Sequence, residues 1–230
     1  MESTIIQVPM SKTNTFLIKG KQGYILIDTG VRGKSKNVQK ALEQQNTTLK
    51  EISLIVITHV HYDHVGSLYA LKSKSSAPVL IHEKAAKLLK QGYTKMPSGT
   101  GWFSKILSGI GSTFVSSRDQ FKPIEPDILI EDDYDLSSFG IDGQVIHTPG
   151  HTADSICVIL EDKYCFTGDT MFNILPHSVF PPFANDQVRL LESWEKIKKY
   201  NCEKYFPAHG RAFTDEKFEI TFKKFISNKS

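Results

Sequence analysis

The chain has few cysteines and no long apolar run. Its cysteines, Cys157, Cys165 and Cys202, are an odd number without C-x-x-C spacing. This excludes a disulfide framework and a cysteine-based zinc finger. No stretch approaches the roughly 18–20 apolar residues of a membrane span, so we expect no membrane association. The N-terminus lacks a basic start followed by an apolar run, which predicts no secretory signal and a cytoplasmic location.

The chain also lacks an excess of charge of one sign. Lys and Arg number 28 and Asp and Glu number 25, which gives a formal net charge of +3 over 230 residues. Nucleic-acid-binding proteins gather basic residues on one face, so this balance predicts no nucleic-acid partner. Apolar residues make up 40% and charged residues 23% of the chain, which argues against a disordered, collagen-like or coiled-coil protein.

Short apolar runs alternate along the chain with segments whose apolar residues recur every three or four positions. The run SLIVIT at 53–58 predicts a strand buried on both faces. We expect further strands at 15–18, 24–28, 78–81, 127–131, 143–147, 155–160, 163–167 and 204–207. We expect helices at 35–45, 67–72, 83–90, 186–200 and 215–226. This order predicts an α/β fold with two sheets face to face and helices outside.

No Pro/Gly-rich linker divides the sequence, so we expect a single domain spanning residues 1–230. Residues 91–120 interrupt the pattern, because they are rich in Gly and Ser yet carry several aromatic side chains. We interpret them as an insertion with a short amphipathic helix near 102–110. Residues 171–184 contain three prolines and predict a loop.

Four potential metal ligands directly follow the buried strand, in the segment Thr58-His59-Val60-His61-Tyr62-Asp63-His64. Residues two apart in an extended chain point the same way, so His59 and His61 can face one point. Asp63 and His64 follow on a turn and can face a second point. Three imidazoles and a carboxylate are costly to bury unless they bind something, and these donors suit zinc, iron or manganese.

Three later segments each place one more potential ligand after a strand. These residues are His151, Asp169 and His209, each in a turn of small residues. Turns at strand ends are where a scaffold presents functional groups, and glycine allows close approach of the backbone. Together with the first segment, they predict one joint metal site.

This set of motifs resembles the metallo-β-lactamase-fold hydrolase superfamily, from the hairpin ending in Asp28-Thr29-Gly30 through His209. The resemblance implies a four-layer αβ/βα sandwich with two metal ions, Zn²⁺ or else iron or manganese, at one edge between the sheets. The implied ligands are His59, His61 and His151 for one metal, Asp63, His64 and His209 for the other, and Asp169 as the bridge. Asp28 either supports a ligand imidazole through a hydrogen bond or simply ends the hairpin.

Two metals about 3.5–4 Å apart can share a hydroxide and lower its pKa toward about 7. We expect this hydroxide to be the nucleophile. Asp63 is the expected catalytic residue, because a ligand carboxylate can orient the hydroxide or shuttle a proton. No Ser or Cys nucleophile is needed.

Differences between this sequence and known subfamilies narrow the range of expected substrates. The Asp at position 169 argues against a true β-lactamase. Only 21 residues follow His209, too few for the glutathione-binding domain of glyoxalase II. The loop at 171–176 lacks the Tyr of the acyl-homoserine-lactone lactonases. The ribonuclease Z group needs a basic RNA-binding arm, and the Gly/Ser-rich insertion at 91–120 is a poor candidate for one.

A small-molecule ester, thioester or lactone with an apolar portion remains the expected substrate. Side chains that could contact it are Tyr93, Trp102, Phe103, Phe172, His177, Phe180 and Phe183. These aromatics could equally pack against one another. The alternative functions are a phosphodiesterase or nuclease of the same fold, an iron-dependent sulfur dioxygenase-like enzyme, and a non-catalytic metal-binding module.

Overall fold

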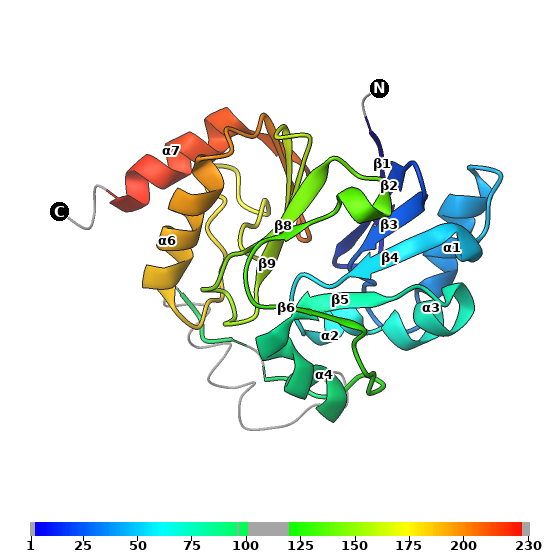
Figure 1. The fold of residues 1–230 in the computed structure, drawn as a ribbon. Coiled ribbons are helices and arrows are strands. Elements are labelled where there is room, and N and C mark those ends of the chain that lie inside the picture. The colour runs from blue at the N-terminus through cyan, green and yellow to red at the C-terminus, as the bar shows by residue number, and fades with distance from the viewer. Residues whose placement is uncertain (1–2, 96, 101–119, 227–230) are drawn as a thin grey trace.

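The computed structural model describes residues 3–95, 97–100 and 120–226. Two sheets face each other, with helices covering the outer side of each (Figure 1). In spatial order, the first sheet contains β1 (Thr4–Pro9), β2 (Asn14–Gly20), β3 (Gly23–Ile27), β4 (Ile52–Val56), β5 (Val79–His82) and β6 (Ile128–Ile130). The second contains β12 (Phe213–Thr214), β11 (Lys204–Pro207), β10 (Tyr164–Gly168), β9 (Ile156–Leu160), β8 (Gly143–His147) and β7 (Tyr134–Asp135).

The strand directions bring several chain reversals to the same end of each sheet. In the first sheet, β1, β2 and β3 pair antiparallel, and β3, β4, β5 and β6 pair parallel. In the second sheet, neighbours from β7 to β10 and the pair β11–β12 are antiparallel, whereas β10 and β11 are parallel. Consequently β3 and β4 end on one edge of the first sheet, and β8, β10 and β11 end on one edge of the second.

Strand β4 shows why its sequence is apolar at every position. Leu54 and Val56 belong to the cluster between the two sheets, together with side chains of β9 and β10. Ile55 and Ile57 belong instead to the cluster under the helices of the first sheet. Successive side chains of a strand alternate between faces, so a strand covered on both sides requires a continuous apolar run, as predicted for 53–58.

The helices form the two outer layers. Helices α1 (Ser35–Glu43), α3 (Leu68–Ser75) and α4 (Ala86–Gln91) cover the first sheet, and α6 (Gln187–Lys198) and α7 (Asp215–Ile226) cover the second. Shorter helical segments are α2 (Tyr62–Val65), η1 (Leu49–Glu51), η2 (Glu83–Ala85) and η4 (Ser137–Phe139). The order helix, sheet, sheet, helix confirms the predicted four-layer sandwich.

The sequence did not predict three of the strands. β1 has mostly exposed or half-exposed residues and no clear alternation, because it is the edge strand of its sheet. β7 and β12 contain two residues each, too few for a periodic signal. The helix predicted for 83–90 begins as a 3-10 turn, in which the His82 ring accepts a hydrogen bond from the Lys84 amide. The helix predicted near 102–110 lies outside the described residues.

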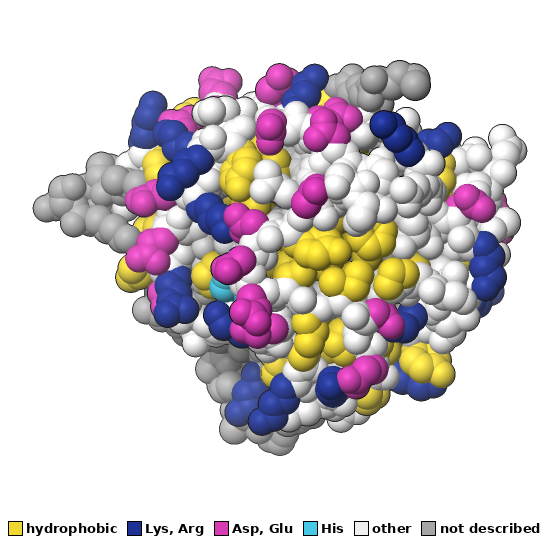
Figure 2. Space-filling view, in the orientation of Figure 1, with side chains coloured by type: hydrophobic (Ala, Val, Ile, Leu, Met, Phe, Trp, Pro, Cys, Tyr) yellow, Lys and Arg dark blue, Asp and Glu magenta, His cyan; other side chains and the backbone are white. Residues whose placement is uncertain are grey.

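The surface mixes both signs of charge. Figure 2 shows Lys and Arg side chains interspersed with Asp and Glu around a central group of hydrophobic side chains on the face it presents. Within the described part of the chain, no helix combines the length and apolar character needed to cross a membrane.

Candidate metal centre

The potential ligands come together because their strands end at the same edge. Asp28 follows β3, and His59 lies three residues after the end of β4. His151, Asp169 and His209 follow β8, β10 and β11 in the same way. Neighbouring imidazole and carboxylate groups from both sheets thus form two adjacent clusters.

The first cluster contains His59, His61, His151 and Asp169, all buried. Nδ1 of His61 lies 2.7 Å from Nε2 of His59 and 3.3 Å from Nε2 of His151. Oδ2 of Asp169 lies 3.4 Å from Nε2 of His151 and 3.8 Å from Nε2 of His59. Three ring nitrogens and one carboxylate oxygen therefore converge on a common point.

The second cluster contains Asp63, His64 and His209. Oδ1 of Asp169 lies 3.2 Å from Nε2 of His64 and 3.4 Å from Nε2 of His209. The same His209 nitrogen lies 3.5 Å from Oδ2 of Asp63. Asp169 therefore turns one carboxylate oxygen to each cluster, which is the arrangement a bridging ligand requires.

Groups behind the ligands orient three of the imidazoles. The Nδ1 atom of His151 lies 2.8 Å from the carbonyl oxygen of Phe183, and that of His209 lies 3.1 Å from the carbonyl oxygen of Lys12. Nδ1 of His64 faces the Asp28 carboxylate at 2.8 Å. A proton on each Nδ1 would donate to these oxygens and leave Nε2 free to bind a metal.

Burial keeps the histidines of the first cluster neutral. Burial, and then the neighbouring imidazoles of His64 and His61, hold the pKa of His59 well below its ordinary value. Burial and the neighbouring His151 lower the pKa of His61 to about 3. Burial also lowers the pKa of His151. A metal binds only the neutral form of imidazole, so these three side chains already have the required protonation state.

The second cluster carries charges that balance one another. Burial alone would lower the pKa of His209, but the carboxylates of Asp169 and Asp63 outweigh burial and raise it to about 9. Asp169 and Asp28 likewise outweigh burial and raise the pKa of His64 well above its ordinary value. Burial would raise the pKa of Asp169, but the charges of His209 and His64 lower it strongly. Without metal, two imidazolium ions thus supply the positive charge that these carboxylates require.

Where the two clusters meet, two buried atoms lack hydrogen bonds within the described part of the chain. These atoms are Nε2 of His64 and Oδ1 of Asp169, which face each other without hydrogen-bond geometry. Buried polar atoms are almost always satisfied. A divalent cation held by these donors would satisfy both, so the residues of the two clusters fit a pair of metal ions.

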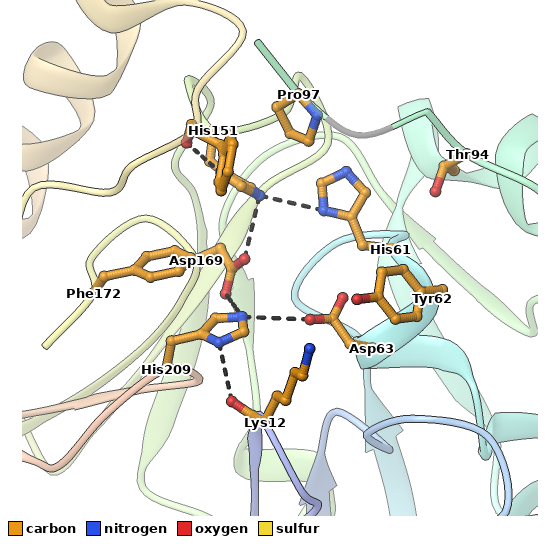
Figure 3. Close-up of a pocket in the computed structure, with 11 residues that line it drawn as sticks. Lys12, His61, Tyr62, Asp63, Thr94, Pro97, His151, Asp169, Phe172 and His209 are labelled. Atoms are coloured by element: carbon orange, nitrogen blue, oxygen red, sulfur yellow. Dashed lines mark hydrogen bonds and ion pairs between the residues drawn. The ribbon is translucent and has the colours of Figure 1, made fainter. Parts of the chain in front are cut away.

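Five of the seven cluster residues line a pocket with roughly 650 Å³ of empty space, part of it open to solvent, and His59 and His64 are not among its lining residues. Figure 3 shows Phe172 on one side and Lys12, Tyr62 and Asp63 on the other. The remaining lining residues are His61, Thr94, Pro97, His151, Asp169, Phe183 and His209.

The structure brings only some of the expected substrate contacts to this pocket. Phe172 lines it and stacks on the His209 ring at a centroid distance of 4.4 Å, and Phe183 also lines it. Phe180 instead packs against Trp194 and Phe225 behind the second sheet.

Two further residues of that prediction, His177 and Tyr93, do not line the pocket. His177 is exposed on the loop between β10 and α6 and is not among the lining residues. Tyr93 forms an isolated bridge with Gln120 and does not line the pocket either. Trp102, like Phe103, lies outside the described residues.

Several residues at the site gave no signal in the sequence. Lys12 contributes a carbonyl oxygen to His209, and a backbone contact of this kind has no residue-type signature. Asp154 accepts a hydrogen bond of 3.0 Å from the amide of Val60, between two ligands. Tyr62, Thr94 and Pro97 line the pocket, and Tyr62 could have been noticed because it lies within the ligand segment.

Known proteins share both the sequence pattern and the fold. The family described as the metallo-beta-lactamase superfamily matches residues 9–209. A probable metallo-hydrolase of Methanocaldococcus jannaschii is 32% identical over 202 residues, covering 86% of this chain and 87% of that protein. The human acyl-coenzyme A thioesterase MBLAC2 is 26% identical over 94% of this chain and 80% of its own length.

Among solved structures, the BLEG-1 B3 metallo-beta-lactamase superposes with a TM-score of 0.72 at 23% identity. The superposition covers 93% of this chain and 95% of that one, which shows a shared fold. The match over residues 9–209, the identity to the archaeal protein and the two ligand clusters lead to one conclusion. This chain belongs to the metallo-beta-lactamase superfamily.

Proposed function

We propose that this protein is a metal-dependent hydrolase that cleaves an ester, thioester or lactone of a small molecule. The observation that carries this proposal is the Asp169 carboxylate, which directs one oxygen to each of two ligand clusters. We propose two Zn²⁺ ions as the cofactors, because neutral imidazole and carboxylate donors suit zinc. Iron and manganese are the alternatives that the experiment must distinguish.

Divalent cations bound at the two clusters would polarise a substrate oxygen and lower the pKa of a water molecule. The residues of the chain hold this site in place. Burial would raise the pKa of Asp63, but contact with His209 and the charge of His64 lower it, so this carboxylate is ionised. Asp63 is only partly buried and lines the pocket. It is therefore placed to accept a proton from water and pass it to a leaving group.

The pocket supports a substrate with an apolar part. Phe172, Phe183 and Pro97 provide apolar contact beside the ligand clusters. The name of the human relative identifies it as an acyl-coenzyme A thioesterase. We therefore favour a thioester with an aliphatic acyl group among the three bond types.

Metal analysis combined with a substrate panel tests this proposal. Protein purified without added metal should contain about two zinc ions per chain. Zinc, manganese and iron forms should then be assayed in parallel with acyl thioesters, aryl esters, lactones and a phosphodiester. Metal-dependent turnover of a thioester, ester or lactone would support the proposal.

Three other results would contradict the proposal. Turnover of the phosphodiester alone would identify a phosphodiesterase. One iron per chain with oxygen consumption on a persulfide would identify a redox enzyme. Full metal loading without turnover of any substrate would favour a binding module.

A further inference from the structure

Lys12 brings a positive charge to a pocket whose other described lining residues include no Lys or Arg. It lies in the turn between β1 and β2, and its side chain extends toward Asp63 at the pocket wall (Figure 3). Its own carbonyl oxygen lies 3.1 Å from Nδ1 of His209. The next residue, Thr13, donates a hydrogen bond of 3.1 Å to the carbonyl oxygen of Asp63. The turn that carries Lys12 is thus attached to both segments of the second cluster, to His209 through the Lys12 carbonyl and to Asp63 through the Thr13 hydroxyl.

The ammonium group of Lys12 has no carboxylate partner within the described part of the chain. Asp63 is paired with His209 instead. Other lysines contact acidic side chains, as Lys196 does with Asp133 at 2.6 Å. Since two divalent cations would add positive charge next to Asp63, the ammonium group of Lys12 is not required to neutralise this carboxylate when the site is loaded.

The opposite wall has a different chemical character. Phe172 is buried against His209, and Phe183 and Pro97 continue the apolar lining. A substrate that fills this pocket would therefore contact apolar side chains on one side and a cation on the other. Such a molecule carries an aliphatic part together with an anionic group.

We propose that Lys12 binds an anionic oxygen group of the substrate, a carboxylate or a phosphate, and so determines specificity for anionic acyl compounds. This inference rests on the proposed hydrolase function. Lys12 is a specificity-determining residue because it offers charge to the substrate and is not among the cluster ligands.

The test compares substrates that differ only in the anionic group. One pair is S-hexanoyl-3-mercaptopropionate and the corresponding neutral amide. The other pair is S-hexanoyl-phosphopantetheine and S-hexanoyl-pantetheine. In the zinc-loaded protein, Lys12→Met should raise KM for the anionic member of at least one pair about tenfold, the size expected for one charge-assisted contact. For the neutral members KM should change less than twofold, and kcat should be unchanged for all four.

Two further variants serve as controls. Lys12→Arg keeps the charge and should retain the preference for the anionic substrate. Lys36→Met removes an exposed lysine on α1, which does not line the pocket, and should behave as the unaltered protein. The pair that responds to Lys12→Met distinguishes a carboxylate from a phosphate. An equal effect on both members of each pair, or no effect on either pair, would overturn the inference.

A binding measurement separates this inference from the proposed function. Calorimetry with S-hexyl thioethers, which cannot be hydrolysed, should show the same tenfold loss of affinity in Lys12→Met for the anionic member only. If no thioester is turned over but this binding difference appears, the hydrolase proposal fails and the role of Lys12 stands. If turnover occurs without any dependence on substrate charge, the role of Lys12 fails and the hydrolase proposal stands.

Discussion

Asp28 holds His64 from the side opposite Asp169. Its Oδ2 atom lies 2.8 Å from Nδ1 of His64, whose Nε2 atom faces Asp169 at 3.2 Å. Asp28 also accepts hydrogen bonds of 2.8 and 2.7 Å from the amide and hydroxyl of Thr58. Its backbone has a φ of +59°, which non-glycine residues seldom adopt. A strained residue that is held by several hydrogen bonds and contacts a potential metal ligand is typical of a functional site.

Replacing Asp28 by Asn should weaken metal binding at the second cluster. Asp28→Asn removes the charge that helps to orient His64, and loss of such a partner typically lowers metal affinity about 10–100-fold. Competition with a chromophoric chelator would measure the metal affinity of each cluster separately. The affinity of the second cluster should fall more than that of the first. Asp142→Asn, at an exposed position, is the matched control. Equal affinities in both variants would show that Asp28 only ends the hairpin.

Removal of the Asp169 carboxylate should affect both metal ions. Asp169→Ala removes both carboxylate oxygens, one of which faces each cluster, so metal content should fall from about two ions per chain to below one. His61→Ala, which alters only the first cluster, should lose about one ion. Elemental analysis of dialysed protein gives the stoichiometry. Full metal loading and normal turnover in Asp169→Ala would contradict the bridging assignment.

Metal binding to the metal-free protein should release protons. His64 and His209 carry raised pKa values, to about 9 for His209, whereas a metal requires neutral imidazole. Loading at pH 7.5 should therefore release about two protons, and apparent affinity should increase as the pH rises toward 9. Calorimetry in buffers of different ionisation enthalpy counts these protons. His209→Ala should release about one fewer, and an unchanged proton count in that variant would exclude His209 as a metal ligand.

The positions of the potential ligands could be predicted best where several of them lie close together in the sequence and directly follow a strand with a clear apolar pattern. The segment from His59 to His64 follows a strand whose apolar positions face both layers, so its placement at the sheet edge could be predicted. Phe180 could not be placed, because an aromatic in a loop can contact either a pocket or a helix. The structure packs it against Phe225 of α7. Lys12 was missed since its role depends on a turn after β1, an edge strand without a periodic signal.

A pair of histidines outside the two clusters, His82 and His147, should make the stability of the fold depend on pH. His82 stacks on His147 with ring centroids 3.8 Å apart, and burial together with the neighbouring His147 lowers the pKa of His82 to about 4. In the unfolded chain this pKa is about 6.5. Between these values the unfolded state binds the proton more readily, so the contribution of neutral His82 to stability is lost as pH falls from 6.5 toward 4.

Urea unfolding of the metal-free protein measures this contribution. From pH 7 to pH 5, His82 should account for about 1–2 kcal/mol of lost unfolding free energy. His82→Gln cannot titrate and should lose correspondingly less stability over this range. An identical pH dependence in the two proteins would assign the loss to other groups, of which the neutral ligand histidines are the foremost.

Gly168 immediately precedes Asp169, and a substitution there tests how closely the two sheets must approach at the site. It has a φ of +49°, and a Cβ there would lie 2.6 Å from Oγ1 and 2.7 Å from Cβ of Thr58. Gly168→Ala must therefore displace Thr58, which is bonded to Asp28 and precedes His59. We expect a loss of about 2–4 kcal/mol in unfolding free energy, from the backbone strain and the contact together.

Gly33→Ala separates the effect of backbone strain from the effect of the close contact with Thr58. Gly33 also has a positive φ, +81°, but nothing lies within 4 Å of the position its Cβ would occupy. This variant should lose only the backbone contribution, about 1 kcal/mol, and should bind metal normally. Because the displaced Thr58 also shifts Asp28 and His59, Gly168→Ala should bind metal at least tenfold more weakly. If both variants lost the same stability and bound metal equally well, the close contact between Gly168 and Thr58 would have no part in forming the site.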